Sequence, residues 1–163
     1  MTRSLELIGY WREVGSNTSW LHPRDLIDES WERDNKAKIV RYLKSGIRIN
    51  EDLGFSHCRF SDGPPDEMMG DAELTDGVWL WPEGLAVYVE RYHVKLPAEF
   101  VAHMRANDYR MRPESDPHTL ANLPVSSSFW ESWCNQNRCQ SSGFAMGSIW
   151  SFLKRALKGP VDA

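Results

Sequence analysis

The fold is decided by residues 73–82, which read Glu73-Leu74-Thr75-Asp76-Gly77-Val78-Trp79-Leu80-Trp81-Pro82. Two short runs of strand-forming residues flank Asp76-Gly77, a dipeptide that tolerates the positive φ angles of a tight type I′ turn. The pattern therefore predicts a β-hairpin. Val78 and Leu80 are expected on one face of its second strand, and Trp79 and Trp81 on the other. Since both faces are apolar, either this strand is central and covered on both sides, or the tryptophan face is a binding surface.

Helical periodicity follows the hairpin. Pro82 suits a first helical position, because its missing N–H costs nothing there, and Pro97 begins a second helix. Upstream, residues 28–44 are predicted to form a helix, and residues 47–49 and 55–60 alternate as strands do. We therefore predict an α+β fold, in which a small antiparallel β-sheet with its hairpin at Asp76-Gly77 packs against several short α-helices.

The chain is expected to fall into three parts. Residues 1–106 form a core domain of hairpin and helices, and residues 107–128 form a polar linker that contains prolines. Residues 129–163 form a C-terminal helical extension that docks on the core. Its last helix, over residues 145–158, has an apolar stripe that would also allow self-association into a homo-oligomer.

Composition limits the classes of function. The 163 residues carry a net charge of −4, and we identify one basic cluster, which lies near the C-terminus. Cations are expected at the negative end of a helix, so this cluster does not require nucleic acid. The N-terminus resembles no signal peptide, and no apolar run is long enough to span a membrane. We predict a cytoplasmic protein that binds neither nucleic acid nor membrane.

The candidates for catalysis are few. A thiol site would use Cys58, with His57 or His93 as its base, but neighbouring strand residues point to opposite faces. Glu83 is a further candidate, among carboxylates that more often simply face water. The sequence has no glycine-rich phosphate loop, nucleophile elbow or zinc-protease helix motif. The pattern favours a protein that is not an enzyme.

The cysteines and histidines give little support to a metal site. Cys134 and Cys139 form one loosely spaced pair, whereas structural zinc usually shows two tight pairs. Additional ligands would have to come from scattered residues, namely Cys58, His93, His103 and His118. The odd count of three cysteines argues against a disulfide framework. We predict free thiols and no metal or cofactor.

Recognition of another protein is the remaining interpretation. Eight tryptophans are more than a core of this size needs, so some are expected to be half-exposed. Tryptophan dominates the binding energy of many interfaces. We predict Trp79 and Trp81 as anchors, and Asp66, Glu67 and Asp71 as carboxylates that attract a basic partner.

Two functions are carried forward. The first is a protein-binding module of the immunity type, which neutralises a toxin encoded nearby by direct contact. The alternative is a small enzyme or ligand-binding domain. Its pocket would lie between the hairpin and the helix that begins at Pro82, and would use His93, Glu83 and Cys58.

The hairpin region also resembles a family of small uncharacterised bacterial proteins. The shared core reads Glu-Leu-Thr-Asp-Gly at 73–77, Trp-Pro-Glu-Gly-Leu at 81–85 and Leu-Pro-Ala-Glu-Phe-Val at 96–101. The resemblance covers residues 20 to 105, and the C-terminal part looks like an addition. Members often continue Cys-Arg-x-Cys-Gly, whereas Ser61 stands at the second cysteine here, which places a metal or thiol-pair role in doubt. The family has no established activity, and the resemblance implies only a small bacterial cytoplasmic domain.

Overall fold

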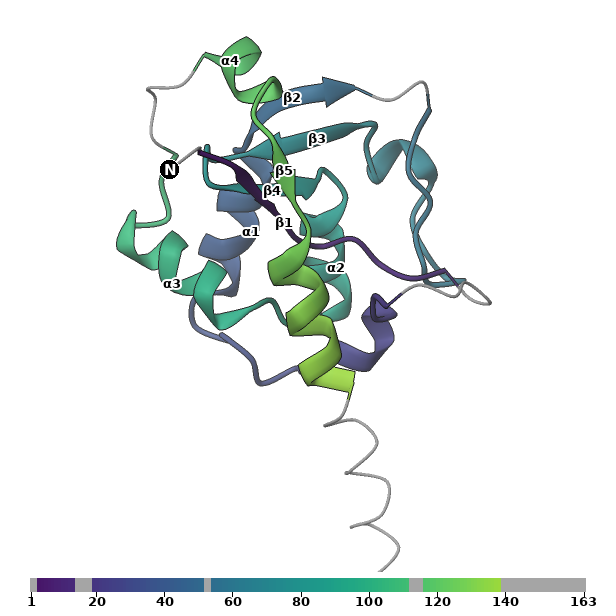
Figure 1. Cartoon of the computed structure of the whole chain (residues 1–163). Coiled ribbons are helices and arrows are strands. Elements are labelled where there is room, and N and C mark those ends of the chain that lie inside the picture. The colour runs from purple at the N-terminus through teal and green to yellow at the C-terminus, as the bar shows by residue number, and fades with distance from the viewer. Residues whose placement is uncertain (1–2, 14–18, 52–53, 112–115, 139–163) are drawn as a thin grey trace, which may run out of the picture.

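A five-stranded sheet with the order β2-β3-β4-β1-β5 forms the centre of the protein, shown in Figure 1 as a computed structural model. The structure describes residues 3–13, 19–51, 54–111 and 116–138. The strands are β1 (Leu5–Leu7), β2 (Ile47–Glu51), β3 (Ala72–Thr75), β4 (Trp79–Pro82) and β5 (Val125–Ser126). Strands β2, β3 and β4 are antiparallel, while β1 runs parallel to both β4 and β5. The predicted α+β fold is confirmed, but the sheet is mixed rather than antiparallel.

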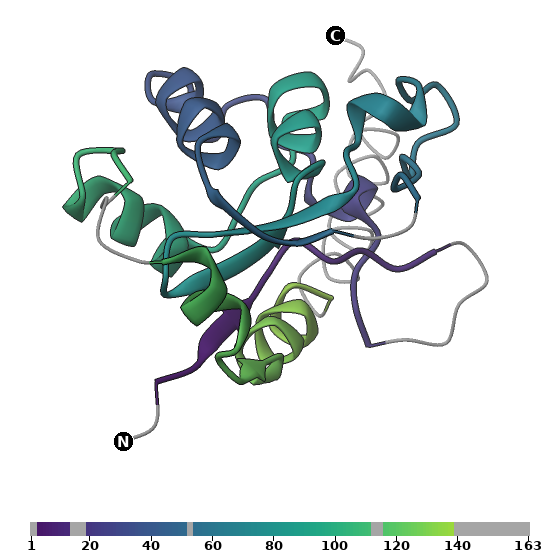
Figure 2. The same cartoon turned by 90° about the horizontal axis from the view of Figure 1, so that it is seen from above.

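Helices lie on both sides of this sheet. The α-helices are α1 (Lys36–Lys44), α2 (Leu85–Tyr92), α3 (Ala98–Ala106) and α4 (Pro117–Ala121), and two short 3-10 helices are η1 (Pro23–Leu26) and η2 (Asp66–Met68). Residues 128–138 are also helical. Figures 1 and 2 place α1 and α2 on one side of the sheet and the 128–138 helix on the opposite side.

The hairpin of β3 and β4 is present, but its turn differs from the predicted one. Thr75 pairs with Leu80, so the connection is longer than a two-residue type I′ turn. Gly77 has a φ of +87°, whereas Asp76 does not have a positive φ. Instead, the Asp76 carboxylate accepts the backbone N–H groups of Val78 and Trp79, at 2.9 and 2.7 Å. The side chain of Asp76, rather than a left-handed backbone at that residue, closes the turn.

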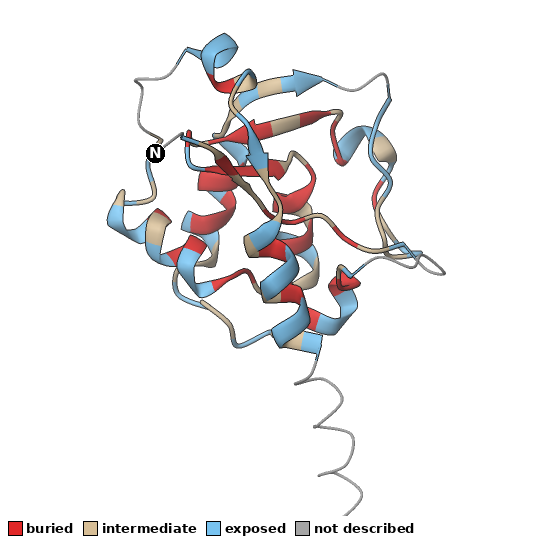
Figure 3. Ribbon diagram, in the orientation of Figure 1, coloured by how far each residue is buried: buried red, intermediate tan, exposed pale blue. Residues whose placement is uncertain are grey.

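The tryptophans of β4 belong to the core. Trp81 is completely buried and Trp79 is 8% exposed. The Trp81 indole N–H donates to the Leu43 carbonyl of α1 at 3.2 Å, and both indoles contact the Phe100 ring of α3. Strand β4 is therefore central and covered on both sides, as Figure 3 shows by its burial. The prediction of Trp79 and Trp81 as partner anchors is wrong, because α1 and α3 cover them.

Other tryptophans do stay half-exposed. Trp20, Trp31 and Trp133 are partly buried and pack against the edge of the core. The expectation that some indoles remain partly accessible is thus confirmed, but for residues outside the hairpin. Trp150 lies outside the described residues.

Three local boundaries differ from the predicted ones. Residues 55–60 form no strand, and the helix predicted from residue 28 begins at Lys36 because Glu32, with a φ of +46°, interrupts it. Pro82 ends β4 instead of starting α2, since the Glu83 N–H still donates to the Ala72 carbonyl at 2.9 Å. The ladder to β3 thereby continues past the proline, and the helix starts at Leu85.

The C-terminal part joins the sheet. The segment predicted as a linker contains α4 and the strand β5, which pairs with β1. Trp130, in the 128–138 helix, is buried, and its indole N–H donates to the Tyr10 carbonyl at 2.8 Å. Trp130 thus packs the described part of this helix onto the core. The helix predicted over 145–158, with its basic cluster, lies outside the described residues.

Candidate functional site

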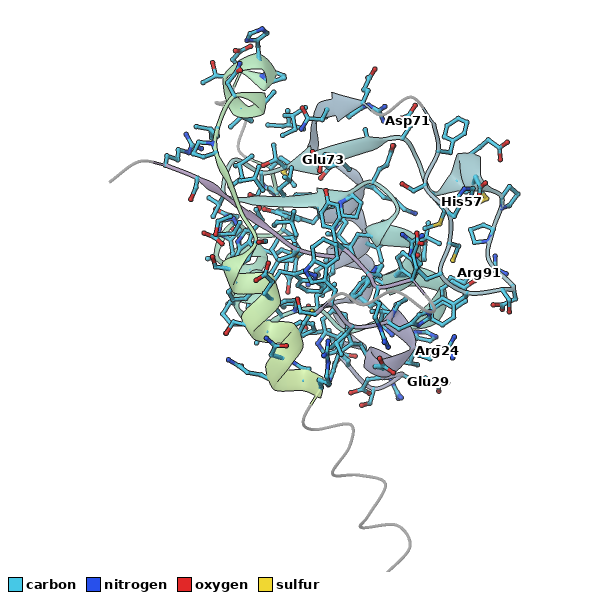
Figure 4. All side chains as sticks on the ribbon, turned by 45° about the vertical axis from the view of Figure 1, so that its right-hand side comes forward. Arg24, Glu29, His57, Asp71, Glu73 and Arg91 are labelled. Atoms are coloured by element: carbon cyan, nitrogen blue, oxygen red, sulfur yellow. The ribbon has the colours of Figure 1, made fainter. Side chains whose placement is uncertain are left out.

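A lobe of irregular chain, residues 54–71, connects β2 to β3 and stands out from the sheet. The backbone N–H of Ser56 donates to the Gly70 carbonyl at 2.9 Å and so ties the two limbs of the lobe together. Pro64 is buried, which anchors the middle of the lobe. The lobe occupies the right-hand side of Figure 1, and Figure 4 brings this side forward, with His57 labelled.

A pocket of about 210 Å³ lies where the lobe meets the junction of β4 and α2; we call it the β4–α2 pocket. Three segments line it: the chain after β1 (Gly9, Tyr10, Trp11), the lobe (Ser56, His57, Arg59, Met69) and the junction itself (Pro82, Gly84, Tyr88). Small-molecule sites usually occupy about 300–1,000 Å³. This pocket is therefore the size of a side chain or a small fragment.

Aromatic rings and hydrogen-bond donors form the pocket wall. The Trp11 and Tyr88 rings meet edge to face, with centroids 5.7 Å apart. The Tyr88 hydroxyl accepts the Arg59 backbone N–H at 2.9 Å. Within the described residues, Trp11 Nε1 and Arg59 Nε are buried without a hydrogen-bond partner. The aromatic rings match an apolar stem, and the polar lining residues Ser56, His57 and Arg59 match an oxygen acceptor.

Tyr88 does not provide a base for catalysis. Burial raises the pKa of its phenol well above the ordinary value, and the Arg59 N–H opposes this rise only in part. The phenol therefore keeps its proton at neutral pH. It acts as a wall and a hydrogen-bonding group, not as a proton acceptor.

Two of the three carboxylates predicted at the rim of the lobe have a polar partner within the described residues. Asp66 lies 2.7 Å from Nδ1 of His57, and Asp71 lies 2.8 Å from the Arg48 guanidinium. Glu67 is exposed and forms no ion pair or hydrogen bond with any described residue. Of the three predicted carboxylates, Glu67 alone has no polar partner within the described part of the chain.

Two large apolar side chains that the sequence pattern does not predict as exposed lie on the surface of the lobe. Phe55 is 48% exposed and Met68 is 63% exposed. Phe55 lies in an alternating pattern that predicts a strand, and Met68 follows two charged residues in the sequence. Neither pattern predicts an exposed apolar side chain. The signal for Met68 is a methionine three residues after Pro64-Pro65, in a stretch with no helical or strand period.

The predicted catalytic residues do not come together. His93 ends α2, and its Nδ1 lies 2.7 Å from Nζ of Lys36. Glu83 instead pairs with Arg48 at 2.9 Å, on the β2 side of the molecule. Cys58 is partly buried against the core and does not line the pocket. A pocket thus exists near the predicted position, but none of these three residues lines it.

The ligands considered for zinc are also dispersed in the described part of the chain. No group of three or more His, Cys, Asp or Glu side chains within it is placed to hold a metal ion. His103 contacts Asp76 at 3.1 Å, and His118 lies on the exposed helix α4. Cys139 lies outside the described residues. Its distance from Cys134 is therefore not part of the described structure.

We expect Cys134 to resist thiol reagents in the native protein. Cys134 is completely buried, and burial raises the pKa of its thiol to about 11. At pH 8, iodoacetamide should label the peptide that contains Cys134 only after urea is added, as measured by mass spectrometry. Cys58, which is partly exposed, provides the internal comparison. Equal labelling of Cys134 with and without urea would show that this helix does not pack as described.

No helix in the described ranges is both long and apolar enough to cross a bilayer. Comparison of the chain with protein-family models, with curated proteins and with solved structures found no match in any of the three.

Proposed function

We propose that this protein is a protein-binding module whose recognition surface is the lobe together with the β4–α2 pocket. The proposal rests on the exposure of Phe55 and Met68, whose neighbours in the chain, Ser56 and Met69, line an aromatic-walled pocket. Phe and Met are enriched where interfaces become buried, whereas most exposed residues of this protein are charged or polar.

The pocket supports recognition of a protein better than of a drug-sized molecule. Its volume of about 210 Å³ accommodates one side chain of a partner, and Phe55 and Met68 provide exposed apolar area on the same lobe. Anchors of this kind, seated in a pocket next to apolar contacts, hold most of the energy in many interfaces. The ion pairs of the lobe remain at its rim, where they contribute little affinity.

The experiment compares three versions of the full chain as immobilised baits. They are the unchanged protein, the double variant Phe55→Ala with Met68→Ala, and Val125→Ala. Val125 is 49% exposed on β5, so it matches Phe55 in exposure but lies outside the lobe. We expect one protein to be retained by the unchanged chain and by Val125→Ala, and its affinity for the double variant to fall at least tenfold, as loss of about 1.4 kcal/mol or more requires.

Each bait is exposed to two samples that could contain the partner. The first is a lysate of the native cell, and the second is the purified product of the neighbouring gene. Capture of that product would support the immunity-type role predicted from the sequence, in which the chain masks a toxin. Absence of any captured protein at micromolar concentration, or equal capture by all three baits, would contradict the proposal.

Ligand binding at the β4–α2 pocket is the second candidate function. The observation that favours ligand binding is a pocket at the junction of the hairpin with α2, near the position predicted from the sequence. A small fragment with a carboxylate or amide would then raise the thermal midpoint of the unchanged protein. It would raise that of Gly84→Val less, since even a Cβ at Gly84 would lie 2.7 Å from the Met69 carbonyl oxygen and so disturb the pocket wall.

A further inference from the structure

Helix α1 carries a basic face on a protein that is acidic as a whole. Its nine residues, Lys36–Lys44, include four cations and no carboxylate, whereas the chain has a net charge of −4. The apolar residues of α1 are buried against the core, among them Ile39, Tyr42 and Leu43. The cations are therefore held on the outer side. The sequence therefore contains a second basic cluster, on α1, besides the predicted one near the C-terminus.

A groove of about 760 Å³ lies along this face, beside the last turns of α2; we call it the α1 groove. Its floor contains the side chains of Ala37 and Val40, and four cations surround them, namely Arg33, Lys36, Arg41 and Lys44. The aliphatic stems of these long side chains add apolar surface, while their charged ends reach water.

The groove keeps a net positive charge. Glu90 is the one carboxylate among its described lining residues, and it pairs with Lys44 at 2.6 Å. Nζ of Lys36 lies 2.7 Å from Nδ1 of His93. Arg33 and Arg41 form no ion pair with any described residue. Two guanidinium groups are thus left to pair with a molecule that enters the groove.

We propose that the α1 groove binds an acidic amphipathic helix of a protein partner. The apolar floor matches the apolar stripe of such a helix, and the arginines match carboxylates on either side of that stripe. Helix α1 is about 13 Å long at 1.5 Å per residue, which corresponds to about two and a half turns of a partner helix. Nucleic acid fits less well, because phosphates leave the apolar floor uncovered and the rest of the chain repels a polyanion.

This surface is independent of the proposed function. None of its lining residues belongs to the lobe or lines the β4–α2 pocket. The protein would then contact partners through two surfaces of different chemistry.

The test uses a fluorescein-labelled designed helix of 14 residues, with leucines along one stripe and glutamates on both flanks. A matched probe has lysine in place of every glutamate. In fluorescence anisotropy titrations with the full chain at low salt, we expect the glutamate helix to bind and the lysine helix not to bind. Binding of the glutamate helix should weaken as salt is raised, because the Debye length shortens from about 30 Å at 0.01 M to about 8 Å at 0.15 M.

Two charge reversals on the same helix distinguish binding in the groove from a general attraction between opposite charges. Arg41→Glu changes a groove cation, and Lys38→Glu changes an exposed cation of α1 that does not line the groove. We expect a loss of affinity of at least tenfold for Arg41→Glu and of less than threefold for Lys38→Glu. Circular dichroism and urea unfolding check that both variants fold as the unchanged chain does.

Equal losses for the two variants would overturn the proposal, as would failure of the glutamate helix to bind. A single-stranded oligonucleotide that displaces the glutamate helix at lower concentration would also overturn it, in favour of nucleic acid.

Discussion

Replacing Asp76 by alanine is expected to lower the free energy of unfolding by about 2–4 kcal/mol, because each buried donor that loses its acceptor costs about 1–3 kcal/mol. The Asp76 side chain is 2% exposed and lies 3.1 Å from Nε2 of His103. It also accepts the Tyr42 hydroxyl at 2.7 Å and two backbone N–H groups of the β3–β4 turn. Its loss removes the acceptor of the Tyr42 hydroxyl and of the Trp79 N–H, both of which are partly buried. Urea unfolding at pH 7 measures the change.

The matched control is Asp66→Ala. Asp66 also pairs with a histidine, at 2.7 Å, but its side chain is 44% exposed and that of His57 is 76% exposed. Exposed pairs contribute about 0–1 kcal/mol, so this substitution should have a small effect on stability. Similar losses for the two variants would show that the Asp76 network is not buried as described.

The same carboxylate makes stability depend on pH. Burial alone would raise the pKa of Asp76, but hydrogen bonds from His103, the Trp79 N–H and Tyr42 outweigh it and lower the pKa below its usual value of 3.8. The contribution of Asp76 is therefore complete above pH 3.8 and is lost as the pH falls towards the folded-state pKa. The difference in unfolding free energy between the unchanged protein and Asp76→Asn should shrink across this acidic window.

Trp81→Ala is expected to cost about 3–5 kcal/mol, as truncations of large aromatic side chains in cores do. Trp81 is completely buried, stacks on Tyr42 with centroids 6.2 Å apart and donates to the Leu43 carbonyl. The measurement is urea unfolding. Trp31→Ala is the control, because Trp31 is only partly buried at the edge of the core. A similar cost for both substitutions would contradict the central position of β4.

The elements whose cause is local could be predicted from the sequence. The hairpin at Asp76-Gly77, β2 and the two helices after β4 follow from alternation, helical spacing and proline placement, and all are present. The type of turn could not be predicted, because it depends on the hydrogen bonds that the Asp76 side chain makes, not on which residues tolerate a positive φ. Pro82 was assigned to the helix, whereas it ends β4. Proline is compatible with both the end of a strand and the start of a helix, so the residue type alone does not decide between them.

Most features that the sequence did not predict depend on contacts between segments far apart in the chain. Strand β1 is parallel to β4 and β5, and β5 lies in a proline-containing segment whose composition is typical of a linker. Nothing local to either segment predicts such a pairing. The exposure of Trp79 and Trp81 likewise depended on whether α1 and α3 cover them, which hydrophobic pattern alone does not decide. The recognition residues were therefore sought in the hairpin, whereas the exposed apolar side chains lie in the lobe.

Hydrogen–deuterium exchange of the chain, with and without the protein that it captures, tests the lobe as a recognition surface most directly. We expect backbone amides of residues 54–71 to exchange more slowly in the complex, and those of β5 to exchange at an unchanged rate. Unchanged exchange throughout 54–71, with slowing confined to other segments, would contradict the assignment.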